Sequence, residues 1–343
     1  MPAFIEDLAQ TALGPWLLLL VGSLLLWGGA ESLVRGAAAL ARRLGLSPMI
    51  IGATVVAFGT SAPELVVSVQ AQVDGKPGSA LGNIVGSNIT NLGLVLGLTA
   101  LILPLPVRRS VVLRELPLVL LAEAGLWALA MVDGRLTRVE GALLLLAFFA
   151  LFFWLIRDAL RTRDSTLVAR SFAEDEGAPD AEAGRPTPRR SVQLAMIVAG
   201  LAGLALGADV FTGGAEVVGL RAGLDEDQVG LLILAFGTSL PELITSVVAA
   251  LRRHVEISLG NLLGSNLFNT LFVGGTMAVI GDVPVARDQL TYHMPVMFGI
   301  TLLVMPLALA GRYRLGRRAG VALVVLDLAW VAGTVLLRGG GAG

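Results

Sequence analysis

Long apolar segments are the feature that most constrains this chain. Stretches of about 18 to 25 mostly apolar residues recur along its 343 residues, and each is long enough to cross a bilayer as a helix. Mean hydropathy is +0.80. Charged residues make up only 15% of the chain, against about 25% in soluble proteins. Because backbone polar groups find no partner in lipid, long apolar segments must form helices. The sequence therefore predicts an all-α polytopic membrane protein.

About ten transmembrane helices are expected, separated by turn-forming sequences such as 74–78, 133–134 and 281–284. Their expected ranges are 14–40, 48–73, 79–103, 110–131, 139–157, 192–220, 228–251, 257–280, 288–309 and 318–337. The first and sixth are longer than a bilayer requires, so they can tilt or bend.

Composition excludes several kinds of site. The chain has no cysteine, which excludes disulfides and thiolate metal centres. His254 and His293 are its only histidines, too few for a histidine metal centre. The N-terminal stretch from Met1 to Leu13 carries Glu6 and Asp7 but no basic residue, so a secretory signal peptide is not expected there. The formal net charge of −1 says little about partners, and no nucleic-acid partner is expected.

An oxygen-rich motif, AFGTSAPEL at 57–65, interrupts the second apolar segment. Thr60 and Ser61 precede Glu64 by four and three residues, so on a helix their oxygens share one face. Pro63 lacks an N–H and opens the preceding turn, which frees a carbonyl oxygen. Such oxygens suit calcium or sodium, and an ionisable group at membrane depth marks an ion path. The alternative is a proline kink with a buried, protonated glutamate.

The motif occurs again as AFGTSLPEL at 235–243, where Glu242 takes the place of Glu64. The same offset in residue number pairs Glu31 with Asp209, Gly52 with Gly230, Ser68 with Ser246, Asn83 with Asn261, Gly86 with Gly264, Ser87 with Ser265, Asn91 with Asn269 and Pro117 with Pro295. Each half then holds five helices, and because five is odd the second half enters the membrane from the opposite side. Two inverted-topology five-helix repeats are expected, at 1–157 and 191–343.

A second polar motif follows each copy of the first, at 82–91 and 260–269. Asn83, Ser87 and Asn91 are spaced by four residues and form one polar stripe on a helix. Asparagines that join neighbouring helices are the structural alternative to ion ligands. Asn88 and Asn266 are rotated by about 100° from the serines and are expected to face elsewhere.

The distribution of arginine among the connections predicts the orientation of the chain in the membrane. Alternate connections on one side hold Arg42, Arg43, Arg108, Arg109, Arg114, Arg157, Arg161, Arg163, Arg170, Arg185, Arg189, Arg190, Arg252, Arg253, Arg312, Arg314, Arg317 and Arg318. The other side holds only Lys76, Arg135, Arg138, Arg221 and Arg287, with Arg338 at the C-terminal end. The positive-inside rule places the first set in the cytoplasm and both termini outside the cell membrane. Residues 158–190 are hydrophilic and read as a cytoplasmic linker.

Both motifs resemble the two α-repeats of the calcium/cation antiporter superfamily, in its prokaryotic sodium/calcium exchanger branch. The resemblance implies that Glu64 and Glu242 coordinate calcium and that Asn91 and Asn269 line the same centre. It implies flanking sodium sites built from the side chains of Thr60, Ser61, Thr238, Ser239, Ser87 and Ser265 and the carbonyls of Ala57 and Ala235. Some relatives carry aspartate where Asn269 stands, so the coupling ratio and any potassium dependence stay open.

The predicted function is exchange of Na⁺ for Ca²⁺ by alternating access. Two carboxylates can neutralise one Ca²⁺ or compensate several Na⁺, whereas an empty site leaves uncompensated buried charge. Calcium and sodium are then cargo in a lipid bilayer, with no resident cofactor. The alternatives are a proton-coupled calcium antiporter of the same fold and a passive cation channel. A hydrolase using Ser61 or Ser239 would lack a histidine or lysine base in the repeats.

Glu31, Asp209, Glu123 and Glu216 are four of the other acids in the expected spans. Glu31 and Asp209 could gate the path or hold structure. Glu123 lies near the middle of the fourth helix, its counterpart in the second half is Thr301, and it is expected to be paired or protonated. Glu216 is left unassigned.

Overall fold

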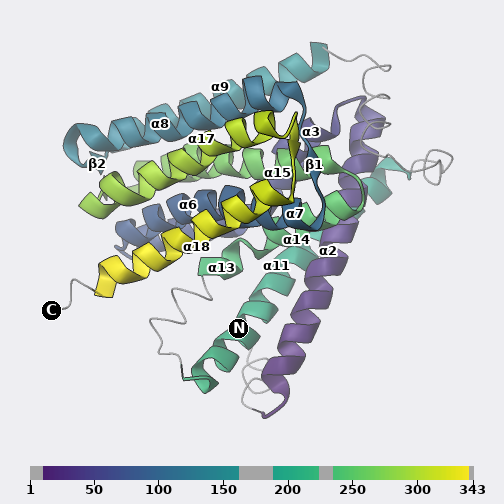
Figure 1. Ribbon diagram of the computed structural model, residues 1–343, viewed down its shortest axis with the longest axis horizontal. Helices are drawn as coiled ribbons and strands as arrows, with labels where there is room; N and C mark the ends of the chain where they lie inside the picture. The colour runs from purple at the N-terminus through teal and green to yellow at the C-terminus, as the bar shows by residue number, and fades with distance from the viewer. Residues whose placement is uncertain (1–10, 162–187, 224–234, 340–343) are drawn as a thin grey trace. The chain divides into compact units, whose positions relative to one another are not determined.

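The computed structural model describes residues 11–161, 188–223 and 235–339 (Figure 1). Its α-helices are α2 (Gly14–Leu44), α3 (Pro48–Ile51), α4 (Ala57–Thr60), α5 (Ala62–Val73), α6 (Pro77–Thr90), α7 (Leu96–Ile102), α8 (Leu116–Asp133), α9 (Arg138–Arg161), α11 (Arg190–Arg221), α13 (Ala235–Thr238), α14 (Leu240–Leu251), α15 (Val255–Leu267), α16 (Gly274–Ile280), α17 (Met294–Ala310) and α18 (Arg317–Gly339). Five π-helical segments interrupt them: η1 (Gly52–Val56), η2 (Asn91–Val95), η3 (Val111–Glu115), η5 (Phe268–Val273) and η6 (Gln289–His293).

These helices confirm the predicted all-α polytopic fold. Within the described residues, 8 helices are long and apolar enough to cross a membrane, and the pair Pro48–Thr60 with Ala62–Val73, bent by 43°, makes up to 9. The described part of the expected span 228–251 is the short α13 and the apolar α14. Residues 162–187 of the expected linker lie outside the described residues.

The chain forms two compact units, and each takes segments from both halves of the sequence. The first unit is Met1–Pro63 with Asp158–Asn261, and the second is Glu64–Arg157 with Leu262–Gly343. The division falls within the first motif, between Pro63 and Glu64.

In the first unit, α2 and α11 lie side by side and run antiparallel (Figure 1). A Cβ atom on Gly29 would lie 2.7 Å from the Leu204 nitrogen, and one on Gly207 would lie 2.7 Å from the Leu26 nitrogen. The two backbones are therefore in direct contact, which only glycine permits at these positions. Since Gly207 is the repeat counterpart of Gly29, the two halves contribute equivalent glycines to this contact.

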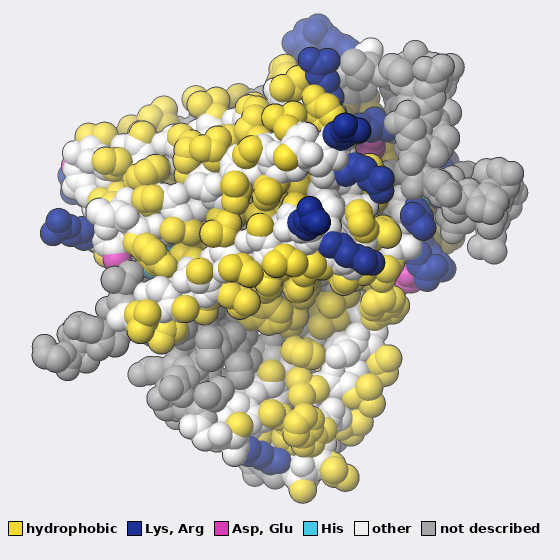
Figure 2. Space-filling model, viewed as in Figure 1, with side chains coloured by type: hydrophobic (Ala, Val, Ile, Leu, Met, Phe, Trp, Pro, Cys, Tyr) yellow, Lys and Arg dark blue, Asp and Glu magenta, His cyan; other side chains and the backbone are white. Residues whose placement is uncertain are grey.

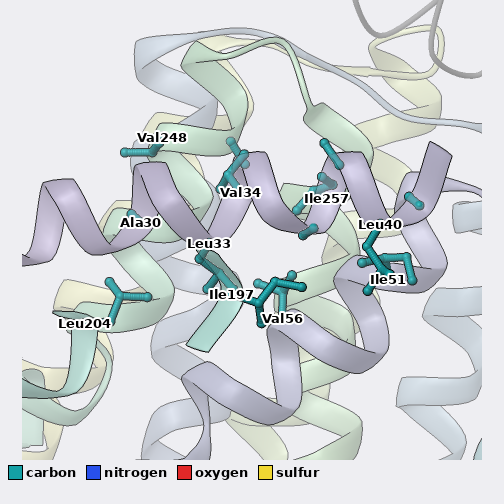
Figure 3. Packing of buried hydrophobic residues seen from close by; sticks show 14 of the residues in the cluster. Ala30, Leu33, Val34, Leu40, Ile51, Val56, Ile197, Leu204, Val248 and Ile257 are labelled. Atoms are coloured by element: carbon teal, nitrogen blue, oxygen red, sulfur yellow. The ribbon is translucent and has the colours of Figure 1, made fainter. Parts of the chain in front are cut away.

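Buried apolar side chains surround this helix pair. Figure 3 shows Leu33 of α2 beside Ile197 of α11 and Val56 of η1. The same cluster includes Val248 of α14 and Ile257 of α15. Between lipid-embedded helices such close packing stabilises mainly through van der Waals contact, because lipid tails are as apolar as the side chains.

In the second unit, the π-helical segments repeat with the sequence. Segment η2 begins at Asn91 and η5 contains Asn269, while η3 and η6 begin at Val111 and Gln289. Pro117 and Pro295 follow η3 and η6 closely. A proline inside a helix removes one hydrogen bond and displaces the carbonyl four residues earlier, which accounts for the widened turn before each proline. Segments η2 and η5 contain no proline, and their sequences gave no such signal.

Two short antiparallel strand pairs in the second unit were not expected from the sequence. Strand β1 (Leu105–Pro106) pairs with β4 (Arg314–Leu315), and β2 (Arg135–Leu136) pairs with β3 (Val283–Pro284). Each pair joins one connection from each half, so the two connections of a pair lie on one side of the membrane. This agrees with the alternation of sides that ten spans require.

Hydrophobic side chains cover the outer faces of α9, α17 and α18 in the second unit (Figure 2). Phe149 and Phe153 of α9, for example, are 56% and 66% exposed. Such surfaces fit contact with lipid acyl chains, and they would be an aggregation hazard in water.

Candidate cation-binding sites

The helix breaks inside each copy of the first motif. In the first copy α4 ends at Thr60 and α5 begins at Ala62, while Ser61 has φ −87° and ψ 8°. In the second copy α13 ends at Thr238 and α14 begins at Leu240, with Ser239 at φ −87° and ψ 0°. The break comes two residues before each motif proline, as the missing N–H predicts. The helix therefore breaks at the expected place in both halves, and in the first half it bends there by 43°.

The first unit joins hydroxyls of the first motif to polar groups of the second half. Ser61 Oγ donates to Glu242 Oε1 at 2.8 Å, and Glu242 is fully buried. Thr60 Oγ1 donates to Asn261 Oδ1 at 3.0 Å. Because each hydroxyl donates its only proton in these bonds, the lone pairs of its oxygen stay available to a cation.

The remaining expected residues of the first unit lie in the same two broken helices. The Ala57 carbonyl accepts from the Ser61 N–H at 3.0 Å and lies 3.4 Å from Thr60 Oγ1. Ser239 is buried, and its Oγ has no hydrogen-bond partner among the described residues. Thr238 is half-buried, and Ala235 is the first described residue of α13.

In the second unit, Glu64 is 1% exposed and its backbone carbonyl accepts from Asn83 Nδ2 at 3.3 Å. Asn83 Nδ2 also lies 3.0 Å from Ser68 Oγ. The equivalent pair, Asn261 Nδ2 and Ser246 Oγ, is 3.3 Å apart in the first unit. Both asparagines thus join neighbouring helices, the structural alternative raised above. Asn261 has in addition the bond from Thr60.

Asn91 and Asn269, expected at the cation centre, both lie in π-helical turns. The Leu96 N–H donates to the Asn91 carbonyl, and the Gly274 N–H donates to the Asn269 carbonyl. Such turns occur frequently at functional sites. Both side chains are buried, as are the nearby Ser87 and Ser265.

The two asparagine amides have different partners. Asn91 Nδ2 donates to Asn266 Oδ1 at 3.1 Å, which leaves Asn91 Oδ1 without a partner in the described part of the chain. For Asn269, neither amide atom has a partner there. Buried amides in folded proteins are normally hydrogen-bonded, so these oxygens are suited to a ligand such as a metal cation.

Asn88 and Asn266, expected to face elsewhere than the serines, bond to each other. Asn266 Nδ2 donates to the Asn88 carbonyl at 3.1 Å, and Asn88 Nδ2 donates to the Asn266 carbonyl at 3.4 Å. Asn88 Nδ2 also reaches Thr270 Oγ1 at 2.7 Å. Residues that contact their own repeat counterparts lie on the local pseudo-two-fold axis of the second unit.

The other acids have distinct surroundings. Glu31 forms ion pairs with Arg35 of its own helix and with Arg252 at the end of α14, at 2.6 and 2.8 Å. These contacts tie α2 to the end of α14, and the choice between a gating and a structural role for Glu31 stays a prediction. Asp209, its repeat counterpart, is exposed.

Asp327 is a buried acid to which sequence reasoning gave no role. It lies in α18, is 2% exposed, and its Oδ1 has no partner among the described residues. Its side chain packs on Gly93 of η2, where a Cβ would lie 2.8 Å from Oδ1. A single acid inside an otherwise apolar span was the signal that could have revealed it.

Oxygen atoms of several chemical types make up these sites. In the described residues there is no group of three or more histidine, cysteine, aspartate or glutamate side chains that could hold a metal. Within the described part of each unit, any cation would therefore depend on hydroxyl, amide and carbonyl oxygens around at most two carboxylates, a donor set that suits Na⁺ and Ca²⁺.

Comparison with known proteins agrees with this chemistry. The family described as sodium/calcium exchanger protein matches the chain twice, over residues 14–157 and 192–335. The putative antiporter CaxA of Alkalimonas amylolytica is 38% identical over 316 residues, covering 89% of this chain and 94% of that protein. The inner membrane protein YrbG of Escherichia coli is 34% identical, covering 92% and 95%.

Among solved structures, the sodium-calcium exchanger NCX_Mj superposes with a TM-score of 0.78 at 28% identity, covering 93% of this chain and 98% of that one. The two separate family matches also agree with the predicted repeat of the two halves. This chain therefore belongs to the sodium/calcium exchanger family, and it is a multi-pass membrane transporter of cations rather than an enzyme.

Proposed function

We propose that this transporter exchanges Na⁺ for Ca²⁺ by alternating access and that Glu64 and Glu242 are its carboxylate cation ligands. The observation that carries the proposal is the 2.8 Å hydrogen bond from Ser61 Oγ to Glu242 Oε1. A hydroxyl of one motif and a carboxylate of the other are thereby held together in a buried place. Such a cluster has no use in packing and suits a hard cation.

The remaining ligands follow from the donor types. Calcium takes six to eight oxygen ligands, both charged and neutral, so the Asn91 and Asn269 amide oxygens would complete its set. The hydroxyls of Thr60, Ser61, Thr238, Ser239, Ser87 and Ser265 and the carbonyls of Ala57 and Ala235 are neutral donors, which suit the singly charged Na⁺.

Obligatory exchange follows from the cost of buried charge. A carboxylate without a counter-charge in an apolar environment is expensive, so the empty protein would change its accessible side slowly. Either cargo removes that cost. We assign the movement to α2 and α11, because their close backbone contact would let the two helices move together.

The coupling ion can be tested in proteoliposomes that contain the purified full chain. Ca²⁺ uptake should require Na⁺ inside the vesicles and should stop when internal Na⁺ is replaced by choline. The matched arm imposes a pH gradient without Na⁺. Uptake that follows this pH gradient would move the assignment to a proton-coupled calcium antiporter, and uptake that needs no counter-ion would indicate a channel.

We propose that the protein lies in the cell membrane with both termini outside and residues 158–190 in the cytoplasm. The excess of arginine on alternate connections supports this orientation. The chain has no native cysteine, so a single introduced cysteine is the only thiol in the protein that the reagent can label. In intact cells, Ser171→Cys should resist a membrane-impermeant thiol reagent, whereas Gly75→Cys should react. The opposite labelling pattern would reverse the orientation.

A further inference from the structure

Basic side chains gather at one end of the second unit, around the end of α17 and the start of α18 (Figures 1 and 2). Strand β1 lies in the connection 103–110 between α7 and η3, and β4 lies in the connection 311–316 between α17 and α18. The two strands pair, and the Val107 N–H donates to the Tyr313 carbonyl at 2.8 Å. The connections and the start of α18 carry six exposed arginines: Arg108, Arg109, Arg312, Arg314, Arg317 and Arg318.

The charges of this arginine cluster lack acidic partners. Neither connection contains an aspartate or glutamate. In the described part of the chain, five of the six arginines form no side-chain ion pair or hydrogen bond: Arg109, Arg312, Arg314, Arg317 and Arg318. Glu115 of η3, the acid nearest along the chain, is ion-paired with Arg114 at 3.4 Å. The strand pair thus brings together two connections that repel each other electrostatically.

The other strand pair, β2–β3, has compensated charges. Arg135 of β2 lies 2.9 Å from Asp133 and 3.7 Å from Asp282, which precedes β3. Pairing of two connections therefore does not require a cluster of like charge. The positive-inside rule accounts for arginines in each connection, but it does not require two such connections to meet. The contact between them calls for a further explanation.

Local backbone preferences are also overridden at the cluster. Arg312 and Tyr313 have φ values of 55° and 61°, in the left-handed region that favours glycine and that glycine commonly occupies at the end of a helix. Arg317 and Arg318 lie in the first turn of α18, where positive charge opposes the helix dipole. Departures of this kind point to a function of the side chains rather than to local stability.

The surroundings of the cluster indicate what it binds. Arginine binds phosphate through two parallel N–H···O bonds. Ile102 at the end of α7 and Leu309 near the end of α17 are 48% and 49% exposed, which suits contact with acyl chains in a membrane. A membrane lipid with a charged phosphate group satisfies both surfaces at once, whereas a soluble anion satisfies only the arginines.

We propose that the arginine cluster around β1 and β4 binds the phosphate of an anionic membrane lipid, whose acyl chains lie against α7 and α17. The lipid neutralises the repulsion between the two connections and thereby stabilises their pairing. A basic residue near an anionic membrane surface strengthens binding by about fivefold. This site is separate from the candidate cation sites.

The test uses the purified full chain in detergent, with phosphatidylglycerol as the anionic probe and phosphatidylcholine as the comparison. Native mass spectrometry counts bound lipid over a titration. The wild type should bind phosphatidylglycerol more tightly, and salt should weaken this preference. Arg312→Gln combined with Arg314→Gln should weaken phosphatidylglycerol binding roughly 25-fold and leave phosphatidylcholine binding unchanged.

The matched control is Arg135→Gln combined with Arg138→Gln, which removes two charges near β2. Its affinity for phosphatidylglycerol should equal that of the wild type. An equal loss in both double variants would indicate a general effect of charge and would overturn the site, as would equal wild-type affinities for the two lipids. Displacement of phosphatidylglycerol by millimolar inorganic phosphate would reassign the cluster to a soluble anion.

A second variant keeps the inference testable if the first cannot be purified. Arg317→Gln combined with Arg318→Gln removes positive charge from the first turn of α18, which favours the helix, and it should also weaken phosphatidylglycerol binding. Wild-type affinity in this variant would contradict the proposal. These measurements use neither Ca²⁺ nor Na⁺, so their outcome is independent of the proposed exchange.

Discussion

The α2–α11 contact is the same in both halves of the internal repeat, whereas the hydrogen bonds of Asn91 and Asn269, the asparagine centre of the second unit, differ. Between α2 and α11, a Cβ on Gly29 would lie 2.7 Å from the Leu204 nitrogen and one on Gly207 would lie 2.7 Å from the Leu26 nitrogen, so the two halves make the same contact. At the centre of the second unit, Asn91 donates to Asn266 Oδ1. The equivalent bond, from Asn269 Nδ2 to Asn88 Oδ1, is not made. Neither of these two atoms has a hydrogen-bond partner among the described residues.

The difference follows from the residues that surround each contact. Glycines stand at equivalent places in both halves of the helix pair, and a backbone contact depends on little else. At the asparagine centre the counterparts Glu123 and Thr301 differ in chemistry, and a hydrogen-bond network must adapt to such a difference. The two copies of a repeated motif can therefore have the same backbone turns and still differ in the hydrogen bonds that their side chains form.

The largest expected effect is on the two motif acids. Glu64→Gln and Glu242→Gln each keep the side-chain shape but remove one charge from a buried place. Each should weaken Ca²⁺ binding by about 3 kcal/mol or more, roughly a hundredfold, and nearly abolish exchange. Sodium-dependent Ca²⁺ flux in proteoliposomes measures this, with Glu115→Gln as the control. Normal exchange in one variant would mean that its carboxylate is not a ligand, and that the halves differ in their acids too.

An intermediate and equal effect is expected at the glycine contact. Gly29→Ala and Gly207→Ala each place a methyl group against backbone atoms, which costs about 1–3 kcal/mol by overpacking. Both should lower the thermal midpoint and slow exchange to a similar degree. Gly28→Ala is the matched control, since a Cβ there meets no atom within 4 Å. Clearly different effects of Gly29→Ala and Gly207→Ala would show that the contact is not symmetric.

A smaller and unequal effect is expected at the asparagines. Asn91→Ala removes a proposed ligand and leaves the Asn266 oxygen without its donor, whereas Asn269→Ala breaks no described hydrogen bond. A lost hydrogen bond to a buried partner costs about 1–3 kcal/mol, so Asn91→Ala should lower stability more. Both variants should reduce Ca²⁺ affinity less than the glutamine substitutions. Equal thermal midpoints would contradict the asymmetry.

Local backbone chemistry was readable from the sequence. The apolar segments predicted the helices closely, and the two motif prolines predicted breaks that the structure shows at Ser61 and Ser239. The constant offset between matching residues predicted the repeat. These features depend on residues within a few positions of one another, or on identity between the two halves. A single sequence contains both kinds of information.

Only the tertiary structure decided which polar groups meet. The bond from Ser61 to Glu242, the ion pair of Glu31 with Arg252 and the burial of Asp327 against Gly93 each join residues far apart in the chain. So does the contact between Glu123 and Thr301. Such pairings depend on how helices pack and rotate. Helical periodicity determines which residues share a face, but only packing determines what that face contacts.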